Sequence, residues 1–293
     1  MYVACRDGHL ASVFGTIHIG LAAMDITAVE LNYNRDRSVA SLDIAFPGAK
    51  ESLADKHLID RFAYKCKGLR IKPSAFILSN NFGANDINAE LEWVISAVKT
   101  AGQLGMKAVR IDAIMSTQNE WSLEKRTSHF ADCMKKVLDA TSNLDVGLGI
   151  ENHGPKGNEQ EFLDSVLDSV GSPRLGLTLD TGNLYWFGRP LSKVYEVIEH
   201  FAPKVKHTHI KSINYPADQR EIQRPIGWEY GKYCSSLREG DIDFGRVFQM
   251  LKNAGYEGDL CIENESLGRF DKAKHKAILI DDAAFIKEKL AAL

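Results

Sequence analysis

The sequence lacks the features that mark several classes of protein. No apolar run approaches the roughly 18–20 residues of a membrane span, so we expect no membrane partner. The five cysteines are scattered and show no Cys-x-x-Cys spacing, which favours reduced thiols over a disulfide framework or a structural zinc site. No glycine-rich phosphate-binding fingerprint follows an early strand, and this absence argues against a Rossmann fold.

An excess of positive charge is also missing. The chain carries 36 lysine and arginine residues against 39 aspartate and glutamate residues, for a formal net charge of -3. Domains that bind nucleic acids usually present a basic surface, so we expect no nucleic-acid partner. The first residues hold no charged segment followed by an apolar core and a cleavage site, so a cytoplasmic location is expected.

The composition is that of an ordinary globular protein, with 44% hydrophobic and 26% charged residues in a chain of 293. One (β/α)8 barrel typically needs roughly 250 residues, so we expect a single domain over residues 1–293. About eight strand-helix units follow one another without a Pro/Gly/Ser linker, which favours an α/β fold with a closed parallel barrel over an open doubly wound sheet. The expected strands are 2–5, 26–32, 72–79, 107–112, 145–151, 175–180, 205–211 and 260–265.

One pattern recurs at the ends of the last four expected strands. In the strand that ends at Glu151, bulky aliphatic residues take one face, while Gly147, Gly149 and Glu151 take the other. Polar side chains on the same face end the next three strands. These side chains are Asp180 in strand 175–180, His207, His209 and Lys211 in strand 205–211, and Glu263 and Glu265 in strand 260–265. Because the carboxyl ends of barrel strands share one mouth, these side chains are expected to converge there.

Convergence of several carboxylates and an imidazole has a chemical consequence. Buried carboxylates repel one another unless a cation neutralises them, and a divalent metal ion is a suitable partner. An oxygen-rich set with a single nitrogen favours a six-coordinate ion such as Mn²⁺, Mg²⁺ or Co²⁺ over a tetrahedral zinc site. We therefore predict one divalent ion, with Mn²⁺ as first choice and Mg²⁺, Co²⁺ or Zn²⁺ as alternatives. About four protein ligands would leave positions open for water or substrate oxygens.

Five motifs in this order resemble those of the xylose-isomerase-like TIM-barrel proteins, which include sugar phosphate isomerases and epimerases, ketose 3-epimerases and inosose dehydratases. The motifs are Glu151-Asn152-His153, Leu179-Asp180-Thr181-Gly182-Asn183, His207-Thr208-His209-Ile210-Lys211, Glu239-Gly240-Asp241-Ile242-Asp243-Phe244 and Ile262-Glu263. The resemblance covers nearly the whole chain. It implies that the metal ligands are Glu151, Asp180, His209 and Glu263, and that His207 is a packed, hydrogen-bonded neighbour one layer deeper.

The resemblance also implies a reaction. In the related epimerases the two glutamates move protons, which makes Glu151 and Glu263 the expected catalytic acid-base groups. A metal chelated by a substrate carbonyl and the adjacent hydroxyl acidifies the neighbouring C-H bond and stabilises an enediolate. Return of the proton then leads to epimerisation or to aldose-ketose isomerisation, and loss of a β-hydroxyl leads to dehydration. The expected partner is a small carbohydrate: a sugar, a sugar phosphate or a related polyhydroxy ketone.

Six side chains are candidates for substrate binding. Asn183 stands where many relatives carry histidine, and its amide can bind a hydroxyl but cannot act as a strong base. Lys211 could neutralise an enediolate or a phosphate, and the remaining candidates are His153, Arg220, Trp186 and Trp228. The two tryptophans could stack on a sugar ring or serve as local packing anchors. Arg220 and Trp228 belong to a long polar and aromatic segment, residues 211–241, that is expected at the active-site face.

Other residues near these motifs have simpler interpretations. Arg110 and Asp112 are expected to form an ion pair that fills the barrel, and Glu265 to lie beside the site or at the surface. The role of His18 stays open. A capping box at residues 158–161 is expected to start a helix.

Three other functions compete with the isomerase or epimerase hypothesis. The closest rival is a lyase that dehydrates an inosose or cleaves an oxidised sugar. An endonuclease-IV-type DNA repair enzyme uses three metals and an Asp-x-His pair, to which Asp218-Gln219-Arg220 is the nearest approach. A non-catalytic sugar-binding barrel is the third. Relatives often form dimers or tetramers, so the resemblance suggests a homodimer or a homotetramer.

Overall fold

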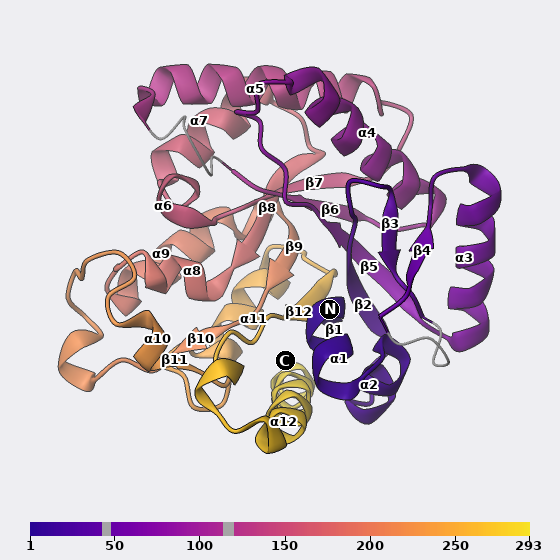
Figure 1. Ribbon diagram of the computed structural model, residues 1–293. Coiled ribbons are helices and arrows are strands. Elements are labelled where there is room, and N and C mark those ends of the chain that lie inside the picture. Colours follow the sequence, from indigo (N-terminus) through magenta and orange to yellow (C-terminus); the bar gives the residue numbers. More distant parts are fainter. Residues whose placement is uncertain (43–47, 114–119) are drawn as a thin grey trace.

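The computed structural model describes residues 1–42, 48–113 and 120–293. Eight parallel strands form one sheet in the order β12-β1-β2-β5-β6-β7-β8-β9, and helices surround it (Figure 1). The strands are β1 (Tyr2–Arg6), β2 (Ala28–Asn32), β5 (Lys72–Ile77), β6 (Ala108–Ile111), β7 (Gly147–Glu151), β8 (Leu175–Asp180), β9 (Val205–His209) and β12 (Asp259–Ile262). All eight lie within or close to the strands expected from the sequence.

The two end strands of this order, β9 and β12, also meet. A parallel bridge joins Ile210 to Ile262, and the backbone N-H of Ile210 donates to the Cys261 carbonyl at 2.7 Å. The Thr208 hydroxyl adds a side-chain hydrogen bond of 2.9 Å to the Asp259 carbonyl. These contacts close the sheet on itself, which confirms the predicted (β/α)8 barrel.

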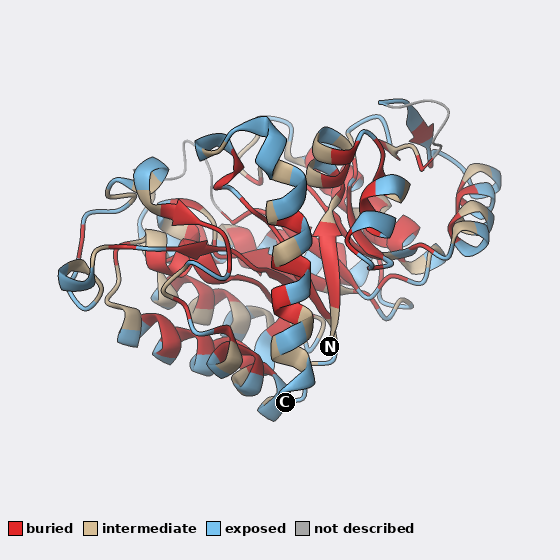
Figure 2. Cartoon of the chain, turned by 90° about the horizontal axis from the view of Figure 1, so that it is seen from below, coloured by how far each residue is buried: buried red, intermediate tan, exposed pale blue. Residues whose placement is uncertain are grey.

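The helices present one apolar face to the barrel and an exposed face to solvent, as Figure 2 shows. Several begin with an aspartate or serine side chain that accepts a backbone N-H; Asp243, for example, accepts from Arg246. The helices are α1 (Asp7–Phe14), α2 (Ile17–Ala23), α3 (Lys56–Leu69), α4 (Ile87–Gln103), α5 (Leu123–Asp139), α6 (Gly154–Gly157), α7 (Gln160–Val170), α8 (Thr181–Trp186), α9 (Leu191–Phe201), α10 (Tyr230–Tyr233), α11 (Phe244–Asn253) and α12 (Lys272–Ala291).

The predicted capping box before α7 was wrong. Glu159 holds the N-cap position, and no side-chain hydrogen bond caps the helix among the described residues. The Asn158 amide instead donates to the backbone carbonyls of Asn152 and Gly154, at 2.9 Å each. Asn158 is therefore used to hold the turn that follows β7, just beyond Glu151, and is not free to cap the helix.

The alternation read from the sequence decides which side chains reach the barrel interior. On β7, Leu148 and Ile150 are completely buried against the surrounding helices, while Gly147, Gly149 and Glu151 face inward. A Cβ atom at Gly149 would lie 2.3 Å from the Thr178 hydroxyl oxygen, so only glycine lets β7 and β8 approach this closely. Large aliphatic residues thus fill the outer layer, and polar residues line the inner mouth.

The segment after β9 is structured and does not form one open loop. It contains β10 (Ser212–Ile213), α10 and β11 (Cys234–Ser235), and the two short strands pair in antiparallel fashion. A second antiparallel pair, β3 (Ser38–Ala40) with β4 (Lys50–Ser52), follows β2. Among the described residues, no helix combines the length and apolar character needed to cross a membrane.

Candidate metal and catalytic site

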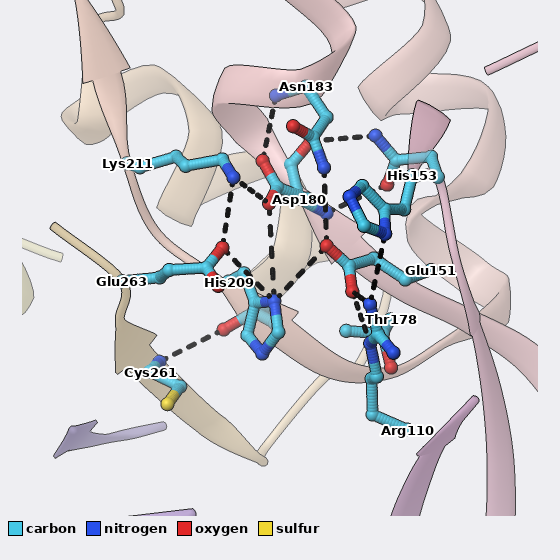
Figure 3. Close-up of polar contacts among 12 residues, drawn as sticks. Arg110, Glu151, His153, Thr178, Asp180, Asn183, His209, Lys211, Cys261 and Glu263 are labelled. Atoms are coloured by element: carbon cyan, nitrogen blue, oxygen red, sulfur yellow. Dashed lines mark hydrogen bonds and ion pairs between the residues drawn. The ribbon is translucent and has the colours of Figure 1, made fainter. Parts of the chain in front are cut away.

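Four side chains meet at the carboxyl ends of neighbouring barrel strands (Figure 3). Glu151 ends β7, Asp180 ends β8, His209 ends β9, and Glu263 follows β12 directly. All four are buried, and one ligand atom from each lies within 4.8 Å of the others. The structure therefore brings together the four residues that the resemblance selected.

His209 is oriented so that one ring nitrogen faces the carboxylates. Its Nδ1 atom lies 3.3 Å from Glu151 Oε1, 3.4 Å from Glu263 Oε2 and 4.0 Å from Asp180 Oδ2. This nitrogen makes no well-aligned hydrogen bond within the described part of the chain. The opposite nitrogen, Nε2, lies 3.0 Å from Glu30 Oε1. When Nε2 carries the proton and donates it to Glu30, the Nδ1 lone pair is left free for a cation.

The charges around His209 are strongly coupled. Burial would lower the pKa of His209, but the carboxylates of Glu30, Glu263 and Glu151 raise that pKa well above its ordinary value. Burial, together with the negative charges of Glu263 and Glu151, raises the pKa of Asp180 well above its ordinary value. The three carboxylates are therefore unfavourable in their fully ionised form unless positive charge lies beside them.

The two glutamates remain ionised because cations lie beside them. Although burial acts in the opposite direction, Arg110 and His209 hold the pKa of Glu151 well below its ordinary value. Burial likewise opposes ionisation of Glu263, whose pKa is held well below its ordinary value by Lys211, His209 and Arg6. Three carboxylates and one free imidazole nitrogen form an oxygen-rich set, and this donor set fits one divalent ion such as Mn²⁺, Mg²⁺, Co²⁺ or Zn²⁺.

Arg110 has a larger role than the sequence suggested. On β6 it faces the barrel interior, and its Nη2 atom lies 2.8 Å from Asp112 Oδ1, so the expected ion pair forms. The same guanidinium also donates to Glu151 and to the Leu78 carbonyl. The predicted ion pair is therefore confirmed, and Arg110 in addition directly orients one of the four converging side chains.

A buried chain of hydrogen bonds continues from His209 into the barrel. Glu30 Oε1 also lies 2.7 Å from His207 Nε2, and His207 Nδ1 lies 3.0 Å from Asp259 Oδ1. Although burial opposes the charge, Asp259 and Glu30 raise the pKa of His207 to about 9. His207 therefore lies one layer below His209, in a position that supports Glu30 and does not face the three carboxylates.

Asp259 also borders a cavity of about 420 Å³ at the opposite, amino-terminal mouth of the barrel. Tyr2, Lys107 and Lys206 are among the other lining residues, and none of the four converging side chains reaches it. Catalytic residues of (β/α)8 barrels lie at the carboxyl ends of the strands, so this cavity is not the candidate active site.

Sequence reasoning missed three residues that contact the four converging side chains or their neighbours. Arg6, at the end of β1, donates to Glu263 and lies 3.4 Å from Glu30 Oε2. Tyr230 on α10 donates its hydroxyl hydrogen to Glu265. Glu30 had a detectable signal, because a charged residue on the inner face of an expected strand requires a buried partner. Arg6 and Tyr230 had no comparable signal.

Two of the six candidate substrate-binding residues lie within the cluster. The Asn183 amide donates to Glu151 Oε1 at 3.2 Å. Lys211 lies deeper than expected: its Nζ atom is 2.9 Å from Asp180 Oδ2 and 2.9 Å from Glu263 Oε2. Substrate contact by either residue stays a prediction.

The other four candidates are held by their neighbours. His153 Nδ1 lies 2.9 Å from Asp112 Oδ1, and the His153 side chain is 41% exposed. Arg220 pairs with Asp241 at 2.9 Å, and the Trp228 ring stacks on Tyr233 with a centroid distance of 5.6 Å. The Trp186 carbonyl accepts the Gly227 N-H.

For these four residues, too, a role in substrate binding stays a prediction. His18 borders a separate hollow with Ile26 and Ile71, at the amino-terminal ends of β2 and β5. This position places His18 away from the mouth where the four side chains converge.

Comparison with known proteins identifies the family. Residues 21–289 match the family described as xylose isomerase-like TIM barrel. The chain belongs to this family. The site geometry described above therefore lies in a barrel of the class that the motifs resembled.

Two sequence relatives illustrate the range of similarity. A protein of Methanocaldococcus jannaschii is 26% identical over 162 residues, which cover 54% of this chain and 50% of the relative. An inosose dehydratase of Clostridium perfringens is 28% identical over 108 residues, which cover 36% of this chain and 35% of the relative. The chain thus aligns with half of the first relative's length and about a third of the second's.

Solved structures share the fold over nearly the full chain. The IolI protein with a bound zinc atom has a TM-score of 0.71 at 17% identity, with 98% of both chains covered. An L-ribulose 3-epimerase has a TM-score of 0.70 at 19% identity, with 100% of this chain and 95% of the other covered. At these identities the similarity establishes the fold alone.

Proposed function

We propose that this protein is a divalent-metal-dependent isomerase or epimerase of a sugar, a sugar phosphate or a related polyhydroxy ketone. The observation that carries the proposal is the placement of Glu151 and Glu263 on the two sides of His209 Nδ1, at 3.3 and 3.4 Å (Figure 3). Membership of the xylose isomerase-like family supports it, as does the structural similarity to an L-ribulose 3-epimerase.

Glu151, Asp180, His209 through Nδ1, and Glu263 are the residues that would hold the ion. A bound divalent ion acts as a Lewis acid on a substrate carbonyl and thereby acidifies the adjacent C-H bond. Mn²⁺ is our first choice, with Mg²⁺, Co²⁺ and Zn²⁺ as alternatives, and the similar IolI structure contains zinc. Glu30 keeps Nδ1 directed toward the three carboxylates by accepting the hydrogen bond from Nε2.

The two glutamates are suited to proton transfer because both are held ionised by neighbouring cations. One carboxylate takes the proton from the carbon next to the carbonyl, and the electron pair of the broken C-H bond moves onto the carbonyl oxygen. The second glutamate acts as the acid once it has taken a proton from solvent, and it returns that proton to the opposite face of the same carbon, which inverts its configuration. Return of the proton to the neighbouring carbon on the same face, with the hydroxyl proton passing from one substrate oxygen to the other, instead produces the aldose-ketose exchange.

Several other residues would shape the substrate site in this proposal. Asn183 positions Glu151 through its amide hydrogen bond, and Lys211 contributes positive charge beside Glu263. His153, Arg220, Trp186 and Trp228 are proposed contacts of the substrate farther from the reacting carbon. We also propose a cytoplasmic location and assembly as a homodimer or homotetramer.

A lyase that dehydrates an inosose or cleaves an oxidised sugar is the second candidate. The observation that favours dehydration is the sequence similarity to the inosose dehydratase of Clostridium perfringens. The same carboxylate would remove the proton next to the carbonyl, and a β-hydroxyl would leave with a proton from the other glutamate as water. The two reactions differ in whether the product retains all of its oxygen atoms.

The test is incubation of the Mn²⁺-loaded protein in D₂O with a panel of ketoses, ketose phosphates and inososes. We expect deuterium at one carbon of one substrate class, and no loss of water. In Glu151→Gln the exchange should disappear while the circular dichroism spectrum stays that of the folded protein. The exposed Glu199 on α9 provides the matched control, and Glu199→Gln should retain the exchange.

Three outcomes would overturn parts of this proposal. Formation of a dehydrated product would assign the lyase reaction. An absence of exchange with every compound would contradict isomerase and epimerase activity. A wild-type exchange rate in Glu151→Gln would remove Glu151 from the acid-base role.

A further inference from the structure

Lys211 occupies an unusual position for a lysine. It is buried, and its Nζ atom lies 2.9 Å from Asp180 Oδ2, 2.9 Å from Glu263 Oε2 and 3.1 Å from Glu265 Oε1. Two of these carboxylates belong to the set that would hold the metal. The ammonium group therefore already contacts the oxygens that a divalent ion would need (Figure 3).

The local structure is built to admit this side chain. A Cβ atom at Gly182 would lie 2.4 Å from Lys211 Cγ, so the glycine at the start of α8 leaves room for the lysine stem. The backbone on either side is fixed, because the Thr181 hydroxyl accepts the Lys211 N-H at 3.1 Å and donates to the Lys211 carbonyl at 2.8 Å. The anchor is rigid, while the four-carbon stem keeps several rotatable bonds.

A third carboxylate is available to the same ammonium group. Glu265 is not one of the four converging residues, and its side chain is 41% exposed. The Tyr230 hydroxyl donates to the second oxygen of Glu265 and so holds that carboxylate beside Lys211. Glu265 can therefore retain the ammonium when Asp180 and Glu263 take another partner.

We propose that Lys211 is a displaceable counter-cation. It neutralises Asp180 and Glu263 in the metal-free protein, and it yields both carboxylates to the divalent ion while Glu265 and Tyr230 keep its ammonium beside the site. This inference rests on the proposed metal site. It follows from charge, because an ammonium and a divalent ion in contact with the same two carboxylate oxygens repel each other.

Substitution of Lys211 and substitution of Glu265 should change metal binding in opposite directions. Removal of the Lys211 ammonium leaves Asp180 and Glu263 without their resident cation, so the metal-free protein loses stability. The metal ion then binds these oxygens without competition from the ammonium. Removal of the negative charge at Glu265 weakens the attraction that retains the displaced ammonium. Lys211 then holds Asp180 and Glu263 more firmly, and metal binding weakens.

The test measures the Mn²⁺ dissociation constant by electron paramagnetic resonance of the free ion in four proteins: wild type, Lys211→Met, Glu265→Gln and the double variant. We expect Lys211→Met to bind Mn²⁺ about tenfold more tightly and Glu265→Gln about tenfold more weakly, within the range known for residues around a metal ligand. The double variant should behave like Lys211→Met, because Glu265 acts only through the lysine. Thermal unfolding without metal should occur at a lower temperature in Lys211→Met, and Mn²⁺ should restore it.

The exposed pair Lys193 and Glu196 on α9, 2.5 Å apart, supplies matched controls. Lys193→Met and Glu196→Gln should leave the Mn²⁺ dissociation constant unchanged. Equal or weaker Mn²⁺ binding by Lys211→Met, in a protein whose wild type binds Mn²⁺, would overturn the inference and leave the proposed function intact. If Lys211→Met fails to fold, an unchanged dissociation constant in Glu265→Gln has the same meaning. A wild type that binds no divalent ion would overturn the inference and the proposed metal site together.

Discussion

Glu30 Oε1 lies between two histidine rings, 3.0 Å from Nε2 of His209 and 2.7 Å from Nε2 of His207. Glu30 is completely buried on β2, and burial opposes its ionisation, yet the two histidines keep its pKa well below its ordinary value. In the neutral His209 ring, the negative charge of Glu30 favours the proton on Nε2, and this tautomer leaves Nδ1 free. One carboxylate outside the four-residue set therefore holds the imidazole with Nδ1 facing the other three carboxylates.

Replacement of this carboxylate by an amide should weaken metal binding. In Glu30→Gln we expect the Mn²⁺ affinity to fall by roughly 10- to 100-fold, because the neutral amide no longer favours the proton on Nε2 of His209. Equilibrium dialysis with metal analysis measures this effect. Glu90 is a buried glutamate on α4 that pairs with Arg35, and Glu90→Gln serves as the control. An unchanged affinity in Glu30→Gln would show that the tautomer is set in another way.

The close approach of β7 and β8 leads to a prediction about stability. In Gly149→Ala the new methyl group would lie 2.3 Å from Thr178 Oγ1 and 2.8 Å from the Thr178 backbone nitrogen, so the two strands must separate. We expect a loss of roughly 1–3 kcal/mol in the free energy of unfolding, as for other overpacked cores.

Gly147 lies on the same face of the same strand and provides the comparison. An added Cβ there meets the flexible stem of Lys206 at 3.1 Å, so Gly147→Ala should cost clearly less. Urea unfolding measures both variants. Equal losses in the two proteins would mean that strand spacing at Gly149 is not the cause.

The pH dependence of stability should carry a signature of Asp282 on α12. Burial raises the pKa of Asp282 from 3.8 to about 6, although the carboxylate accepts hydrogen bonds from Leu237 N and Asn264 Nδ2. Because the folded-state value is the higher one, the stability that Asp282 contributes is fully present below pH 3.8 and is lost as the pH rises through about 6. The difference corresponds to about 3 kcal/mol.

Asp282→Asn cannot ionise and should not show this loss. Its free energy of unfolding, relative to that of the wild type, should therefore increase between pH 4 and pH 7 by up to about 3 kcal/mol. The new amide N-H could face Asn264 and destabilise the variant by the same amount at every pH. This would lower its free energy of unfolding throughout and would not change how the difference from the wild type depends on pH. Asp139→Asn, at an exposed position on α5, removes one carboxylate at the surface and serves as the comparison variant. A difference for Asp282→Asn that does not change with pH would contradict the raised pKa.

Much of the fold was predictable because alternation and strand-end chemistry are local properties of the chain. Residues 145–151 show both: the aliphatic residues mark the outer face, and the glycines lead to an inward carboxylate at the end. Repetition of this pattern in three later strands indicated where polar side chains converge, about eight strand-helix units indicated the barrel, and the family resemblance chose His209 over His207. The capping box failed because the Asn158 side chain has a stronger use in the turn after β7.

The missed contacts depend on how the barrel closes. Arg6 reaches Glu263 across 257 positions of sequence because β1 lies beside β12 in the closed sheet. Lys211 reaches Glu263 because the bridge between Ile210 and Ile262 aligns the two chain segments. Neither of these two contacts follows from composition, periodicity or spacing. The sequence could therefore indicate which side chains face the mouth of the barrel, but not which cations pair with which carboxylates.

The most direct test of the metal site is a crystal grown with Mn²⁺ and measured at the manganese absorption edge. The proposed site predicts one strong anomalous peak per chain, enclosed by the carboxylates of Glu151, Asp180 and Glu263 and by Nδ1 of His209. A map with no peak among these four side chains, or with a cluster of three ions, would contradict it.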